Sequence, residues 1–97
     1  MRELVLTQTA KEDLEQIASF LQETFSQKTK IDFLTAFSER LHLIEKMPFM
    51  YQASYSNPNV RRCLIHKNVV CYYQVTDDHI LILAVIDTRM NPDNRPF

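Results

Sequence analysis

The chain has 97 residues, of which 45% are hydrophobic, including six Phe and four Tyr, and its formal net charge is −1 at neutral pH. This length supports one domain over residues 1–97 with a single core, because chains of this size bury roughly 60–68% of the surface exposed on unfolding. The composition excludes a disordered chain, and the near-neutral charge excludes a general affinity for polyanions.

The sequence contains no glycine. Glycine adopts positive φ angles most readily, and Asn and Asp follow it. A tight turn that needs positive φ must therefore use an Asn or an Asp. The candidates are Asn57, Asn59, Asn68 and Asp77.

The first part of the chain predicts a strand and then a helix. Residues 2–6 form a short apolar run that suits a strand. Thr9 and Glu12 have the spacing of a capping box, in which each side chain bonds the backbone N–H of the other residue, so we expect the helix to begin at Thr9. Apolar residues then recur at helical spacing and predict one buried stripe. Its members are Leu14, Ile17, Ala18, Leu21 and Phe25.

A second helix is predicted up to Met47. The polar residues 26–30 interrupt the first pattern, and a new apolar stripe follows them. Pro48 disfavours helical geometry at Met47 and ends the helix there. The two segments therefore predict a helical hairpin. The second stripe consists of Ile31, Leu34, Phe37, Leu41 and Ile44.

The second half of the chain predicts three strands. After a mixed segment at 49–59, which is typical of a loop, residues 60–65 and 69–75 are rich in β-branched and aromatic residues. Residues 66–68 form a short hairpin link in which Asn68 is expected to take the left-handed conformation. Residues 77–78 form the next turn, and residues 80–86 are apolar at every position. That run is typical of a strand that is covered on both faces or flanked by two others, so we expect it to be the most buried.

The order of these elements predicts an α+β fold. An N-terminal strand, a two-helix hairpin and three consecutive strands should form a mainly antiparallel sheet with both helices on one face. We expect the hairpin to pack on the strand at 80–86, with Ile82 or Leu83 fully buried, because no other predicted surface is apolar enough. The helix side chains expected at this contact are Leu14, Ile17, Leu21, Leu34, Phe37 and Leu41.

Cys63 and Cys71 lie inside apolar runs and lack the paired spacing of a zinc or redox motif, so we expect buried thiols without a disulfide, and neither a metal nor a cofactor. No apolar stretch approaches the roughly 20 residues of a membrane span. The first residues, Met1-Arg-Glu3, lack the apolar core of a signal peptide. A cytoplasmic location is therefore expected.

Several segments together resemble the RelE/ParE toxin superfamily, and the similarity extends over nearly the whole chain. Each segment is short, and their order and spacing carry the resemblance. In chain order they are Thr9-Ala-Lys-Glu-Asp-Leu-Glu-Gln-Ile17, Leu43-Ile-Glu-Lys-Met-Pro48, Arg61-Arg-Cys-Leu-Ile65, Tyr72-Tyr-Gln-Val75 and Ile82-Leu-Ala-Val-Ile-Asp-Thr-Arg89, followed by Asn91-Pro92.

The resemblance implies the toxin of a bacterial type II toxin–antitoxin pair, which a cognate antitoxin silences by lying across its surface. It implies one of two targets for the free toxin. The RelE-like branch cuts messenger RNA on the ribosome, and the ParE-like branch blocks DNA gyrase. A homodimer or a toxin–antitoxin heterotetramer is compatible with either branch.

RNA cleavage without a metal needs a group that removes the proton of a 2′-hydroxyl, donors around the phosphate and an acid for the leaving oxygen. Residues of these types fall on the predicted strands or at their ends, and Arg89 is the best match to the family. The neighbouring Tyr72 and Tyr73 alternate across the sheet, so one must face the core. Arg89 also has an alternative role in a salt bridge to Asp87 or to a carboxylate of the tail. The candidates are Arg61, Arg62, His66, Lys67, Tyr73 and Arg89.

The chain departs from the RNA-cleaving pattern in two ways. That branch is usually strongly basic and has a Tyr or His near its C-terminus that handles protons. Here the net charge is −1, and neither residue type occurs after Arg89. Both departures favour a ParE-like inhibitor that is not an enzyme. The alternatives are a RelE-like endoribonuclease and a degenerate, non-toxic α+β binding module.

Overall fold

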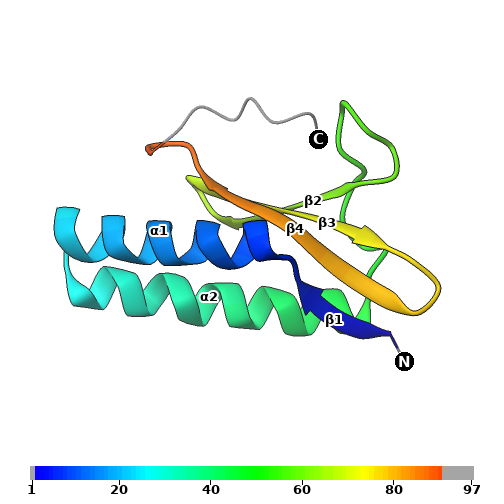
Figure 1. Ribbon diagram of the computed structural model, residues 1–97, viewed down its shortest axis with the longest axis horizontal. Helices are drawn as coiled ribbons and strands as arrows, with labels where there is room; N and C mark the ends of the chain where they lie inside the picture. Colours follow the sequence, from blue (N-terminus) through cyan, green and yellow to red (C-terminus); the bar gives the residue numbers. More distant parts are fainter. Residues whose placement is uncertain (1, 91–97) are drawn as a thin grey trace.

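The computed structural model describes residues 2–90 and confirms the predicted order of elements (Figure 1). The predicted segment Asn91-Pro92 lies outside the described residues. The strands and helices are β1 (Glu3–Leu6), α1 (Gln8–Thr24), α2 (Gln27–Lys46), β2 (Arg61–His66), β3 (Val69–Val75) and β4 (His79–Asp87).

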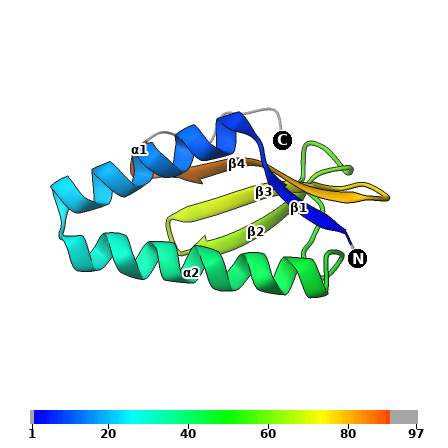
Figure 2. The ribbon, with the colours of Figure 1, turned by 60° about the horizontal axis from the view of Figure 1, so that its bottom comes forward.

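The four strands form one sheet in the order β1-β4-β3-β2. The β4 strand, predicted to lie between two others, is parallel to β1 and antiparallel to β3, and β2 is antiparallel to β3. Both helices cover the same face of this sheet, α1 along β4 and α2 along β2, as Figures 1 and 2 show. The predicted α+β layout with a mainly antiparallel sheet is therefore confirmed.

The main core lies between the helices and the sheet. Ile17, Leu21 and Phe37 are buried against it, and Ile82 is fully buried, as predicted. Leu14 and Leu41 pack at its border. Leu34 does not belong to it, because this side chain is 39% exposed on the outer side of α2, so that part of the packing prediction is wrong. Phe33 fills the place in the core instead.

A second, smaller apolar cluster occupies the other face of the sheet. It consists of Val60, Val70, Tyr72 and Ile86, with Leu83 packed against it. Alternation along the strands explains the division, since Tyr72 points to this face and Tyr73 to the face that the helices cover.

The predicted start of α1 at Thr9 is wrong by two residues. The N-cap is Thr7, whose hydroxyl oxygen accepts from the backbone N–H of Ala10 at 3.2 Å. The same hydroxyl donates to the carbonyl of Ile82 at 2.8 Å. The helix therefore begins after Thr7 and not at Thr9, because the Thr7 hydroxyl both caps the helix and bonds the carbonyl of Ile82 in β4, a residue distant in sequence.

The link between the helices is shorter than predicted. Ser26 is the N-cap of α2 and accepts from the N–H of Thr29, so residues 27–30, expected in the interruption, form the first turn of the helix. Phe25 ends α1 and is exposed, although its spacing predicted burial. Polar residues in a first helical turn can satisfy its free N–H groups, so low hydrophobicity alone did not mark a loop here.

No residue among the described 2–90 has a positive φ angle, so the prediction for Asn57, Asn59, Asn68 and Asp77 is wrong. The link between β2 and β3 makes its tight turn without a positive φ angle. Its register shifts by one residue between Leu64 and His66. A bulge of this kind adds twist beside the turn, which lets a two-residue link without positive φ join the strands.

Beyond Leu6, where β1 ends, helix α1 covers the free edge of β4. The Thr7 N–H donates to the carbonyl of Ile82, and the carboxylate of Asp13 accepts from the N–H of Val85 at 2.9 Å. Asp13 is buried, and its carboxylate supplies a partner that the backbone of a longer β1 would otherwise supply.

Candidate functional site

The end of β4 holds a closely paired Asp and Arg. Asp87, the last residue of the strand, has a fully buried side chain, and Arg89 follows two residues later. The Arg89 Nη2 and Nε atoms donate to the two carboxylate oxygens at 2.7 and 3.1 Å, and the Arg89 backbone N–H donates to one of them at 2.8 Å. The hydrogen bond to Asp87 raises the pKa of Arg89. The salt bridge that the sequence offered as the alternative role of Arg89 is therefore present.

Two aromatic rings at the end of α1 also contact the Arg89 guanidinium. Its central carbon lies 5.1 Å from the ring centroid of Phe25 and 5.9 Å from that of Phe20. Such contacts attract a cation to the face of a ring. Together with Asp87 they fix the direction of the side chain, which is nevertheless 29% exposed and available to a partner.

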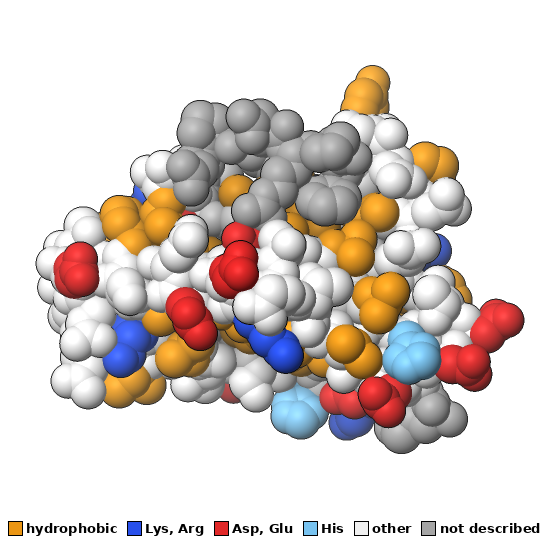
Figure 3. Space-filling view, in the orientation of Figure 1, with side chains coloured by type: hydrophobic (Ala, Val, Ile, Leu, Met, Phe, Trp, Pro, Cys, Tyr) orange, Lys and Arg blue, Asp and Glu red, His pale blue; other side chains and the backbone are white. Residues whose placement is uncertain are grey.

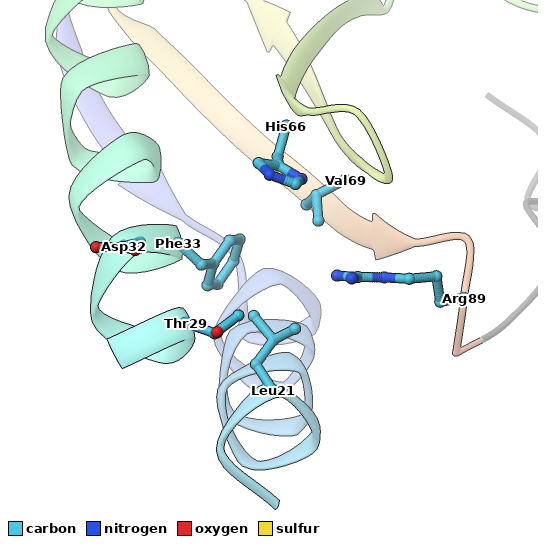
Figure 4. A pocket seen from close by; sticks show the side chains of 7 residues that line it. All are labelled: Leu21, Thr29, Asp32, Phe33, His66, Val69 and Arg89. Atoms are coloured by element: carbon cyan, nitrogen blue, oxygen red, sulfur yellow. The ribbon is translucent and has the colours of Figure 1, made fainter. Parts of the chain in front are cut away.

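Arg89 lines a cavity of about 250 Å³ between the helical hairpin and the β2–β3 link (Figure 4). Its apolar wall comes from Leu21, Phe33 and Val69, and its polar groups come from α2, from the end of β2 and from the turn after β4. Figure 4 shows Arg89 and His66 reaching from the strand side toward Phe33 and Leu21. The remaining lining residues are Thr29 and Asp32. A guanidinium and an imidazole above apolar side chains suit a group that is partly anionic and partly apolar.

Arg61 and Tyr73 lie together at a different site, beside the loop that follows α2. The Arg61 Nη1 atom donates to the carbonyl of Tyr51 at 2.6 Å, and the Tyr73 hydroxyl donates to the carbonyl of Pro48 at 2.7 Å. The Tyr73 side chain is fully buried, and burial raises its pKa. These two candidates hold the loop in place, and neither borders the cavity at Arg89.

The other two candidates are exposed and do not line the cavity. Arg62 is opposite Tyr72 in the register, which places its side chain on the face of the sheet away from the helices. Lys67 is exposed in the β2–β3 turn. Tyr72 and Tyr73 point to opposite faces as alternation requires, and both are buried. Of the six candidates, the structure therefore brings His66 and Arg89 together at the cavity and Arg61 and Tyr73 together beside the loop.

Sequence reasoning missed the helix residues of the cavity and the buried Asp13. Thr29, Asp32 and Phe33 belong to α2 and become neighbours of His66 only in the folded chain, so no local motif marks them. Asp13 did carry a signal. It lies three residues after Ala10 and four before Ile17, so a carboxylate occupies a position on the buried stripe.

Both cysteines carry free, buried thiols, as predicted, and they are opposite each other in the register of β2 and β3. Burial raises the pKa of each. Across residues 2–90, no three His, Cys, Asp or Glu side chains are grouped closely enough to hold a metal ion. Neither helix in this part of the chain combines the length and apolar character of a membrane span.

Several solved structures share this fold. The chromosomal ParDE toxin–antitoxin system from P. aeruginosa has a chain with 17% identity and a TM-score of 0.78, over 90% of this chain and 96% of that one. The Staphylococcus aureus YoeB dimer has a chain with 17% identity and a TM-score of 0.61, over 86% of this chain and 92% of that one. The E. coli DinJ–YafQ complex has a chain with 12% identity and a TM-score of 0.58, over 94% of this chain and 98% of that one.

No curated protein matches this sequence significantly. The sequence itself, however, matches a defined family over residues 4–92, which span the sheet, both helices and the Asp87–Arg89 pair. That family is described as the ParE toxin of the type II toxin–antitoxin system parDE. The chain therefore belongs to the ParE toxin family.

Proposed function

We propose that this type II toxin is held inactive by a cognate antitoxin and that, once free, it blocks DNA gyrase without cutting RNA. Family membership and a fold shared with the ParDE and DinJ–YafQ assemblies support the antitoxin. We expect the antitoxin to contribute a helix or an added strand and to bury more than about 1,000 Å². The β2 strand is an edge of the sheet, and the loop segment 52–54 pairs with its first residues, so an added strand would lie along its later part.

The observation that carries the gyrase reading is the separation of the chemically capable residues. RNA cleavage needs a base, an acid and phosphate donors within reach of one substrate. In the described part of the chain, Tyr73 is buried and bonded to Pro48, and Arg61 lies beside it, away from His66 and Arg89. The Arg89 guanidinium is already engaged by Asp87. This arrangement favours a binding surface over a reaction centre.

The endoribonuclease alternative depends on one specific observation. His66 and Arg89 line the same cavity, so a base and a phosphate donor are close to each other. If this cavity were catalytic, His66→Gln would abolish cleavage while the toxin stayed folded, because His66 is exposed. The same substitution should leave a gyrase block intact if binding alone is involved.

The test uses toxin released from its antitoxin and refolded. It is added to a gyrase supercoiling assay and, separately, to translating ribosomes whose mRNA is read by primer extension. We expect supercoiling to stop near one toxin per gyrase, with the mRNA intact, for both the parent and His66→Gln. Cleavage of mRNA that His66→Gln abolishes would establish the RelE-like alternative. No effect in either assay would mark a degenerate binding module.

A further inference from the structure

Four of the eight strongly exposed large hydrophobic side chains among residues 2–90 lie in the loop between α2 and β2. They are Met47, Phe49, Met50 and Tyr55, and we call this set the 47–55 surface. Figure 3 shows hydrophobic side chains at the upper right of the molecule, over the place where Figure 1 draws this loop. Single exposed apolar residues are ordinary, but several of them on one loop make that loop a candidate interaction site.

The loop is held in place by hydrogen bonds from the sheet. Tyr73 donates its hydroxyl to the carbonyl of Pro48, and Arg61 Nη1 donates to the carbonyls of Phe49 and Tyr51 at 3.4 and 2.6 Å. The N–H of Arg62 donates to the carbonyl of Gln52. These bonds hold the backbone on both sides of Phe49, so its ring stays 57% exposed and does not turn into the core. A rigid aromatic side chain binds with a smaller loss of entropy than a mobile one.

Two guanidinium groups lie beside the Phe49 ring. The central carbons of Arg2 and Arg61 are 5.3 and 5.0 Å from its centroid. Among the described residues neither Arg makes an ion pair, and Arg2 Nε donates to the carbonyl of Thr76 instead. The surface therefore combines exposed apolar side chains with two guanidinium groups that have no carboxylate partner within residues 2–90.

We propose that the 47–55 surface is a docking site for the antitoxin and that the antitoxin segment covering it carries apolar side chains flanked by Asp or Glu. The charge of Arg2 and Arg61 defines the acidic part of this partner, and Phe49 with Met47 and Met50 defines the apolar part. This inference rests on the proposed function, in which the antitoxin is the partner that stays bound while the toxin is stored. A partner bound for that long keeps an apolar surface from causing aggregation.

The test compares the affinities of full-length variants for purified antitoxin, measured by calorimetry at low and high salt. Phe49→Ala should weaken binding at least about 30-fold, as truncation of an aromatic interface anchor does. Arg2→Gln should weaken binding about fivefold at low salt and less at high salt, because salt screens the ion pairs. Ile31→Ala is the matched control, since Ile31 is 50% exposed on the outer side of α2, and should bind within about twofold of the parent.

The possible results separate this inference from the proposed function. Parent-like binding by Phe49→Ala and Arg2→Gln would overturn the docking site and leave the antitoxin in place. A parent that binds no antitoxin would overturn the proposed function itself. Loss of self-association in Phe49→Ala, with antitoxin affinity unchanged, would assign the surface to a second copy and overturn the inference.

If Phe49→Ala does not fold, a measurement on the unmodified toxin tests whether the antitoxin binds the 47–55 surface. Amide hydrogen exchange is compared with and without antitoxin. Exchange at residues 47–55 should slow at least about tenfold in the complex, because docking adds stability to the local structure. An unchanged rate at these amides would overturn the docking site.

Discussion

Among single residues, the pairing of Arg89 with Asp87 has the strongest consequence for mutagenesis. Because the Asp87 carboxylate is fully buried, Arg89 serves the folded state even if it also contacts a partner. A loss of toxicity on substitution would therefore not by itself identify a contact residue. The stability of each variant must be measured beside its activity.

We predict that Arg89→Ala lowers the free energy of unfolding by about 3 kcal/mol, since it leaves a buried carboxylate without its cation. Urea denaturation measures this change. The control is the same substitution in an Asp87→Asn background. There Arg89→Ala should lower the free energy of unfolding by at least about 1 kcal/mol less than in the parent, because no buried charge remains. A variant that keeps full stability but loses toxicity at least about tenfold would show instead that Arg89 acts mainly as a contact.

The buried Cys71 predicts a loss of stability in alkali. Its pKa is raised in the folded protein because burial disfavours the thiolate, whereas the unfolded thiol ionises at about pH 8.5. The folded state therefore holds more protons above that pH, and the stability present in full below it falls as pH rises. Each such thiol contributes a slope of about 1.4 kcal/mol per pH unit.

Urea denaturation with a reductant between pH 9 and 10 checks this slope. Cys71→Ala should reduce it by about 1.4 kcal/mol per pH unit, whatever its effect on stability at neutral pH. Equal slopes in the parent and Cys71→Ala would contradict the predicted effect. Tyr51 and Tyr73 ionise in the unfolded chain at about pH 10, and because both proteins contain them, their contribution cancels in the comparison of the two slopes.

At the scale of elements, the two threonines before and within α1 form a natural pair of variants. Thr7→Ala should lower the free energy of unfolding by about 1 kcal/mol or more, because it removes the N-cap and the bond to Ile82. Thr9→Ala should change it little, since Thr9 is exposed within the first helical turn and Ala is a better helix former. The opposite order would restore Thr9 as the functional cap.

The two faces of the helical hairpin predict a similar contrast between leucines. Leu21 is 1% exposed, so Leu21→Ala should lower the free energy of unfolding by about 2–5 kcal/mol. Leu34→Ala should lower it by less than about 1 kcal/mol, because this side chain is 39% exposed and lies outside the core. Thermal and urea unfolding measure both variants, and equal losses would argue against the outward position of Leu34.

At the scale of the whole molecule, alternation and periodicity predicted the order of elements, the hairpin of helices and the burial of Ile82. They failed wherever a distant contact decided the outcome. Thr7 replaced Thr9 because Ile82 accepts its hydroxyl, and the cavity at Arg89 joins Phe33 of α2 to His66 of the β2–β3 link. The spacing of residues in the sequence does not indicate such contacts. The sequence could therefore predict individual site residues, but not which of them lie together.

The arrangement of strands predicts an order of local stability across the molecule. Amides of β3 and β4 should exchange hydrogen only on global unfolding, because these two strands lie inside the sheet. Amides of residues 55–59, which lie at the tip of the α2–β2 loop, should exchange at least about 100-fold faster. Two-dimensional NMR in deuterium oxide measures both sets, and protection of the tip at the level of β4 would contradict this order.

The parallel pairing of β1 with β4 also sets a time scale. Glu3 pairs with His79, so the first strand made by the ribosome waits for a partner that is synthesised 76 residues later (79 − 3). At about 5–20 residues per second, this interval lasts roughly 4 to 15 s. During it the chain cannot complete its sheet, so the native fold does not yet exist. Antitoxin that is translated during the same interval can bind the toxin as soon as the toxin reaches its native fold.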